Sequence, residues 1–143
     1  MDRLIHLAKV WWLTVPEPRV FSLGWGAAYL MLGCAGLLAL VDPPQSLIGS
    51  AGWLPAVLSL GGLNVLGMFI AMVSGWCDFW KGERLGLAFM LGAAGIYAGL
   101  IVTLQLHESG NRWVQFFYVA FTLVVLGLRY LMIRWYTFRP REG

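Results

Sequence analysis

The sequence predicts an all-α, polytopic membrane protein in which four transmembrane helices form an up-down-up-down bundle preceded by an amphipathic interfacial helix. Its four long apolar stretches are each about 20 residues or longer, enough to cross a roughly 30 Å hydrocarbon layer as a helix. The 143-residue chain is 59% hydrophobic and only 12% charged, with a mean hydropathy of +0.73. Nearly every charge lies outside the apolar stretches, so we expect no separate soluble domain.

The predicted organisation has three parts. Residues 1–19 form the interfacial helix and a proline-rich link, residues 20–135 form the transmembrane domain, and residues 136–143 form a basic tail. The predicted spans are about 20–41, 53–77, 85–106 and 113–135. The connections 78–84 and 107–112 are short, which favours antiparallel neighbours.

Basic residues predict the orientation, because Lys and Arg in short loops are retained on the cytoplasmic side. Arg112 is the basic residue of the predicted outer loops, whereas Lys81, Arg84 and the basic tail belong to the other side. We therefore expect both termini in the cytoplasm. The net charge of +3 is explained by this retention and by attraction to the lipid bilayer, so no nucleic-acid partner is invoked.

The first element, Asp2 to Thr14, has apolar side chains on one helical face and charged side chains opposite. Such a helix lies in the membrane interface. It is either an anchor that positions the first span or an element that perturbs the membrane.

Small residues align along the predicted spans and indicate where helix backbones can approach closely. The predicted helix-packing residues are Gly26, Gly33, Asn64, Gly67, Ala71, Gly75, Gly92, Gly95 and Gly99. Gly95 and Gly99 have the GxxxG spacing. These faces serve either packing within one bundle or self-association between copies.

The fourth span carries an intramembrane polar face formed by Gln115, Tyr118, Thr122 and Arg129. An ionisable residue in a span usually faces protein or water. Arg129 is therefore expected to snorkel to the interface as an anchor or to have an internal partner, for which Asp78 is a candidate at the same depth. The alternative is a water-lined path.

The densest charge cluster belongs to the connection between spans two and three and comprises Asp78, Lys81, Glu83 and Arg84. It is expected to be a tight inner turn with retention charges. A binding site for lipid headgroups or for a partner is the alternative.

Motifs for catalysis are missing from the sequence. The histidines His6 and His107 are predicted on opposite sides of the membrane, and the sequence has no HExxH, GxSxG, P-loop or dinucleotide fingerprint. Cys34 lies within a predicted span and Cys77 lies near its boundary, so a disulfide between them is not expected. We expect no enzymatic activity, no cofactor and no metal site.

Five short segments carry a resemblance to a known group: VPEPRV at 15–20, PPQS at 43–46, GWCDFWKGER at 75–84, SGNR at 109–112 and RWYTFRP at 134–140. In this order they resemble four-span membrane proteins of actinobacteriophages, some of which are treated as holin-like. The resemblance spans nearly the whole chain. It implies a location in the cytoplasmic membrane of a host bacterium and carries over no functional residue.

The resemblance makes a holin-like role the leading hypothesis. The protein would self-associate as a homo-oligomer and depolarise or permeabilise the host membrane. The alternative is a non-lytic interaction protein that excludes competing phages or docks phage or host proteins. A small channel or transporter is a third hypothesis.

Overall fold

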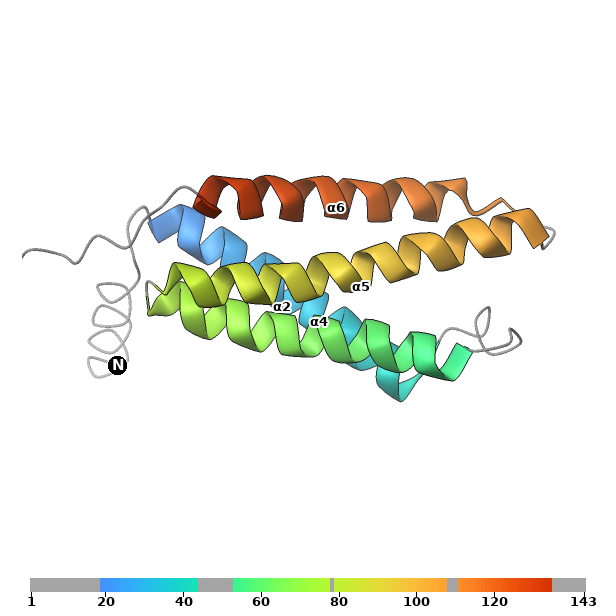
Figure 1. The fold of residues 1–143 in the computed structure, drawn as a ribbon, viewed down its shortest axis with the longest axis horizontal. Helices are drawn as coiled ribbons and strands as arrows, with labels where there is room; N and C mark the ends of the chain where they lie inside the picture. The colour runs from blue at the N-terminus through green and yellow to red at the C-terminus, as the bar shows by residue number, and fades with distance from the viewer. Residues whose placement is uncertain (1–18, 44–52, 78, 108–110, 135–143) are drawn as a thin grey trace, which may run out of the picture.

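A computed structural model describes residues 19–43, 53–77, 79–107 and 111–134. These residues form four α-helices, namely α2 (Arg19–Val41), α4 (Trp53–Trp76), α5 (Trp80–His107) and α6 (Trp113–Arg134), shown in Figure 1. They contain 23, 24, 28 and 22 residues. All four are long and apolar enough to cross a membrane, as expected of a small multi-pass integral membrane protein.

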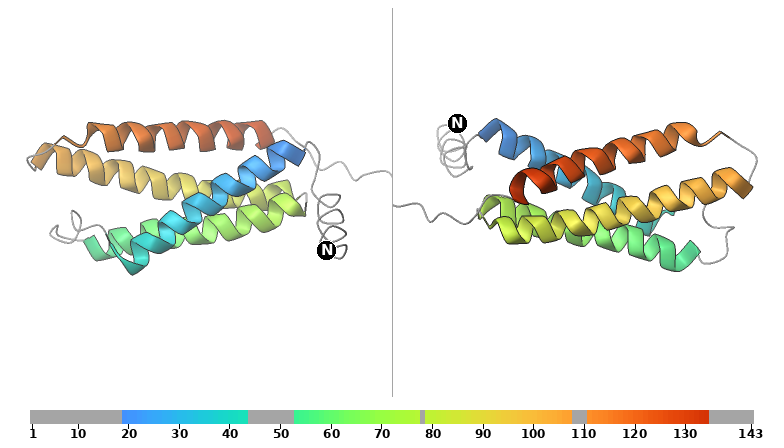
Figure 2. Two further views of the ribbon diagram at one scale, coloured as in Figure 1. Left: turned by 180° about the vertical axis from the view of Figure 1, so that it is seen from behind. Right: turned by 45° about the horizontal axis from the view of Figure 1, so that its top comes forward.

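Helices that are consecutive in the chain pack against each other, α2 on α4, α4 on α5 and α5 on α6. At one end of the molecule, α2 and α5 begin and α4 and α6 finish (Figure 1). We call it the Glu83 end, after a residue described below. Here α2 begins close to the last part of α6, and it then crosses obliquely to finish beside α4 (Figures 1 and 2).

Glycines allow the closest helix contacts. A Cβ added at Gly36 would lie 2.6 Å from the Cβ of Asn64 and 2.9 Å from the carbonyl oxygen of Gly61, so α2 and α4 meet nearly backbone to backbone. A Cβ at Gly86 would lie 2.6 Å from both the amide nitrogen of Ala71 and the carbonyl oxygen of Gly67. Without side chains at these positions, α5 lies directly against α4.

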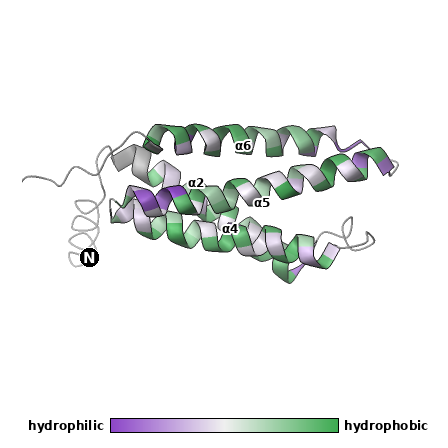
Figure 3. Cartoon of the chain, viewed as in Figure 1, coloured by the Kyte–Doolittle hydropathy of each residue, from purple (hydrophilic) through white to green (hydrophobic). Residues whose placement is uncertain are grey.

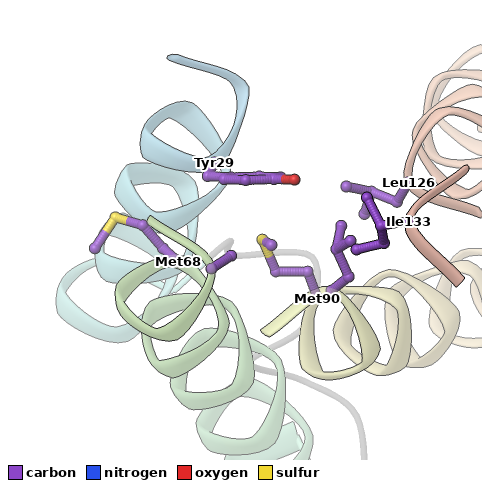
Figure 4. Packing of buried hydrophobic residues seen from close by; sticks show 7 residues of the cluster. Tyr29, Met68, Met90, Leu126 and Ile133 are labelled. Carbon is purple, nitrogen blue, oxygen red and sulfur yellow. The ribbon is translucent and has the colours of Figure 1, made fainter. Parts of the chain in front are cut away.

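The core lies toward the Glu83 end, where all four helices contribute side chains. Figure 4 shows Tyr29 extending from α2 across Met90 toward Leu126 and Ile133 of α6. Leu87, Met90 and Ile133 are fully buried, and Tyr29 is only 2% exposed. A smaller cluster at the other end joins Val57 of α4 to Leu104 of α5. Leu60, Ala93 and Ile101 are also buried, outside these two clusters.

Most of the outer surface is apolar. Large side chains such as Met31, Phe69, Leu106 and Phe121 are more than half exposed, a surface suited to lipid rather than to water. Figure 3 shows hydrophilic residues gathered at the beginning of α5 and, at the other end of the molecule, where α5 finishes and α6 begins. The middle of each helix is therefore left to contact hydrocarbon.

The helix boundaries follow the predicted spans except at α5, which begins at Trp80 rather than at Leu85. The connection between α4 and α5 is correspondingly tight. The amide of Phe79 donates to the carbonyl of Ser74, and the carbonyl of Phe79 accepts from the amide of Glu83. The proposed interfacial helix, the link before α2 and the basic tail lie outside the described residues.

Candidate functional site

The candidate site is centred on Glu83, an acidic side chain in the first turn of α5 that is 1% exposed. The tight turn before Trp80 places this residue against α4, because the chain has no length in which to move away. The first turn of a helix favours negative charge, since its free amide groups form the positive end of the helix dipole. This position partly offsets the cost of burying a carboxylate.

Two helices supply hydrogen-bond donors to one oxygen of Glu83. The Nε and Nη2 atoms of Arg129 on α6 donate to Oε1 at 2.9 and 2.8 Å. The hydroxyl of Tyr29 on α2 donates to the same Oε1 at 2.7 Å. One carboxylate oxygen of α5 therefore links three helices.

Trp25 provides a further contact for Arg129. The guanidinium carbon lies 5.3 Å from the centre of the indole ring, which is within the range of a cation–π interaction. Trp25 and Tyr29 lie one turn apart on α2, with ring centres separated by 6.2 Å. The side chain of Arg129 is 15% exposed and that of Glu83 is 1% exposed, so both charges are largely removed from the surroundings of the protein.

The second oxygen of Glu83, Oε2, is buried and has no hydrogen-bond partner among the described residues. It lies toward Gly75 of α4, where an added Cβ would be 3.9 Å away. Both oxygens of a carboxylate can accept hydrogen bonds, yet Tyr29 and Arg129 both donate to Oε1.

Arg84, the residue after Glu83, reaches the last turn of α6. Its Nη2 atom donates to the carbonyl oxygen of Ile133 at 2.8 Å. The last carbonyls of a helix have no partner within the helix and form the negative end of its dipole. Arg84 therefore caps α6 while Glu83 pairs with Arg129, and the two side chains together fasten α5 to α6.

The chemistry of this site is that of a neutralised ion pair. Breaking a buried pair is costly, whereas the intact pair presents no net charge to lipid. The described residues include no group of three or more His, Cys, Asp or Glu that could hold a metal ion. Cys34 and Cys77 are free thiols and are both exposed. The geometry supports a structural link between helices.

The proposed polar face of the fourth span divides into two parts. Arg129 faces the interior and pairs with Glu83, whereas Asp78, the partner suggested by the sequence, lies outside the described residues. Gln115 and Tyr118 are exposed. The hydroxyl of Thr122 donates to the carbonyl of Tyr118 within α6. The four residues therefore do not line one common path in this structure.

The proposed inner turn is also divided. Lys81, Glu83 and Arg84 all belong to α5, so the segment after Phe79 is helical rather than a turn. Lys81 is exposed, while Glu83 is buried. Gly82 fits closely against Ser74 of α4, so the first turn of α5 packs on α4 as a helix. This contact extends the interface between α4 and α5 by another turn.

The proposed packing residues fall into two groups. Gly33, Asn64, Gly67 and Ala71 lie at helix contacts, and Gly75 faces Glu83. By contrast, a Cβ at Gly26, Gly95 or Gly99 would meet no described atom within 4 Å, and one at Gly92 would just touch Leu63 at 3.9 Å. The face of α5 that packs on α4 instead contains Gly82 and Gly86.

Sequence reasoning missed the partner of Arg129 and the role of Tyr29. The signal for Glu83 was its spacing: Glu83, Gly86, Leu87 and Met90 follow the period of one helical face, and all four are buried. Reading the segment as a turn concealed this pattern. Tyr29 gave a weaker signal, as a tyrosine among the small residues of the first span.

No family model, no curated protein and no solved structure matches this chain.

Proposed function

We propose that this chain acts as a holin-like protein in the cytoplasmic membrane of a host bacterium. It crosses the membrane four times in an up-down-up-down arrangement, with both termini in the cytoplasm. Copies of the chain associate in the membrane and depolarise or permeabilise it. No catalysis by the chain is required.

The supporting observation is the separation of charge from the lipid-facing surface. The buried carboxylate of Glu83 is neutralised by Arg129, while the outer surface of the four helices is largely apolar. A protein of this kind can accumulate in a bilayer without exposing buried charge to lipid. The resemblance to phage membrane proteins agrees with this role.

Self-association has a candidate surface on α5. Ala88, Gly92, Gly95 and Gly99 are exposed along this helix. Small residues let helix backbones approach closely in a bilayer. In the proposed mechanism a second copy covers this surface, and the other faces of α5 remain packed on α4 and α6.

The ion pair constrains what a lesion could present to water. As long as Arg129 is paired with Glu83, it cannot line an aqueous path. Gln115 and Tyr118, which are exposed on α6, are available instead. Assembly through intact protomers would therefore give a lesion with few charges along its spans.

The same ion pair favours one alternative function. A chain whose buried charges are fully committed to linking its own helices suits a stable, non-lytic membrane protein. Such a protein would exclude competing phages or dock phage or host proteins through its exposed ends. No lesion would form.

Inducible expression in a bacterium with a potential-sensitive dye separates the two functions. A holin-like protein produces abrupt depolarisation, followed by lysis only when an endolysin is co-expressed. Protection against a second phage with the membrane potential unchanged would instead support the non-lytic alternative and contradict lesion formation.

A matched pair of variants tests the role of α5 in this assay. Gly95→Leu with Gly99→Leu should abolish depolarisation by blocking close approach of a second copy. Gly24→Leu with Gly62→Leu is the control, because a Cβ at either of those glycines also meets nothing within 4 Å among the described residues. If the α5 double variant depolarises the membrane as strongly as the control double variant does, assembly through α5 is ruled out. Membrane levels of each variant are compared on immunoblots.

A further inference from the structure

The two halves of α2 are held in different ways. The second half is clamped to α4 by glycine contacts: a Cβ at Gly33 would lie 2.8 Å from the Cβ of Met68, and one at Gly61 would lie 2.8 Å from the carbonyl oxygen of Gly36. These contacts involve backbone and the stems of side chains, so they leave little freedom for separation.

The first half of α2 has no such clamp in the described chain. A Cβ at Gly24 or Gly26 would meet nothing within 4 Å. Helix α2 packs mainly against α4. It approaches α5 and α6 through aromatic side chains. Tyr29 reaches Glu83, and Trp25 covers Arg129.

Both aromatic contacts depend on charge. The phenol of Tyr29 donates to an ionised carboxylate, and hydrogen bonds to ionised groups are stronger than neutral ones. The indole of Trp25 is attracted by the guanidinium of Arg129, which is itself positioned by Glu83. Loss of the charge on Glu83 would weaken the bond to Tyr29 and release Arg129 together.

The contacts that hold the first half of α2 converge on one oxygen of Glu83. Oε1 accepts all three of these hydrogen bonds, and Oε2 accepts none from the described residues. Among the described residues, the titratable groups that hydrogen-bond to this carboxylate are Tyr29 from α2 and Arg129 from α6. From α4 it faces Gly75, which does not titrate.

We propose that the first half of α2 is a movable arm and that ionised Glu83 is the latch that holds it against α5 and α6. With the latch broken, the arm pivots about the clamp at Gly33 and Gly36, and the side chains of Glu83 and Arg129 are uncovered. The inference concerns the fold of one chain and applies to either function proposed above.

Distance measurements by pulsed electron paramagnetic resonance in proteoliposomes test this latch. The background carries Cys34→Ser and Cys77→Ser. Spin labels are placed at Ala27→Cys on the arm and Leu128→Cys on α6, both of which are exposed positions. The control pair, Ala35→Cys on α2 and Leu66→Cys on α4, spans the clamp and also uses exposed positions.

Glu83→Gln should shift the distance between positions 27 and 128 to longer values and broaden its distribution, with the distance between 35 and 66 unchanged. Tyr29→Phe, which keeps the ring and removes only the hydroxyl, should shift the first distance in the same direction. If Glu83→Gln does not fold, Tyr29→Phe alone decides. An unchanged distance between 27 and 128 overturns the latch, as does an equal change in both pairs, because the arm would then not move separately from the clamp.

Discussion

Both Nε and Nη2 of Arg129 donate to the same oxygen of Glu83, at 2.9 and 2.8 Å, and so join the first turn of α5 to the last part of α6. A side-on pair usually uses both oxygens of the carboxylate. Here the hydroxyl of Tyr29 also donates to Oε1, and Oε2 is left toward α4. The geometry therefore makes Glu83 the common partner of two other helices.

Removing only one member of the pair should be more harmful than removing both. Glu83→Met leaves the buried guanidinium without its carboxylate and should lower the free energy of unfolding by about 3 kcal/mol. Combining it with Arg129→Met should restore most of the loss. Unfolding in mixed detergent micelles, followed by circular dichroism, measures this coupling. Tyr118→Phe is the control at an exposed position, and additive effects of the two Met substitutions would argue against the pair.

The contact of α4 with α5 should be sensitive to a single methyl group. Gly86→Ala should destabilise the fold by about 1 to 3 kcal/mol, because the added carbon collides with the backbone of α4. Gly95→Ala is the matched control, since a Cβ there meets nothing within 4 Å among the described residues. Thermal unfolding in detergent distinguishes them. Equal melting temperatures for the two variants would mean that the helices are not in such close contact.

The orphan oxygen of Glu83 should accept a new donor. Gly75→Ser places a hydroxyl beside Oε2 and should stabilise the protein by about 1 kcal/mol relative to Gly75→Ala, since a buried acceptor without a partner is costly. The alanine variant controls for helix propensity and volume. The same unfolding measurement applies, and a serine variant no more stable than the alanine variant would show that Oε2 already has a donor.

Arg84 should protect the end of α6. Arg84→Met removes the hydrogen bond to the carbonyl of Ile133 and should cost about 1 kcal/mol, concentrated in the last turn of that helix. Hydrogen–deuterium exchange should therefore be faster near Ile133. Lys81→Met removes the same charge from an exposed position of the same helical segment. Faster exchange near Ile133 in both variants would assign the effect to general charge loss.

The four spans could be predicted because helix length in a bilayer is dictated by hydrocarbon thickness, and residues such as those from Trp53 to Trp76 satisfy it by composition alone. The beginning of α5 could not be predicted in this way. Charged residues near a span suggest a loop, yet Glu83 is accommodated in the helix by a partner from α6, distant in sequence. Such pairing depends on how helices are placed in space, which periodicity within one span does not reveal.

The small-residue faces illustrate the same distinction. Gly67 and Gly86 meet across a helix interface, while Gly95 and Gly99, with an equally favourable spacing, face outward. Spacing identifies faces on which close approach is allowed. Which face is used depends on the tilt of each helix, and α5 approaches α4 on the side of Gly82 and Gly86.

The most direct test of the ion pair that links α5 to α6 is the distance between the guanidinium of Arg129 and the carboxyl carbon of Glu83 in a lipid bilayer. Solid-state NMR with ¹⁵N-labelled arginine and ¹³C-labelled glutamate measures it through their dipolar coupling, with Arg129→Met and Glu83→Gln identifying the signals. We predict the strong coupling of a direct ion pair, with a nitrogen-to-oxygen distance of 2.8 Å. No coupling between these groups in the folded, membrane-embedded protein would contradict it.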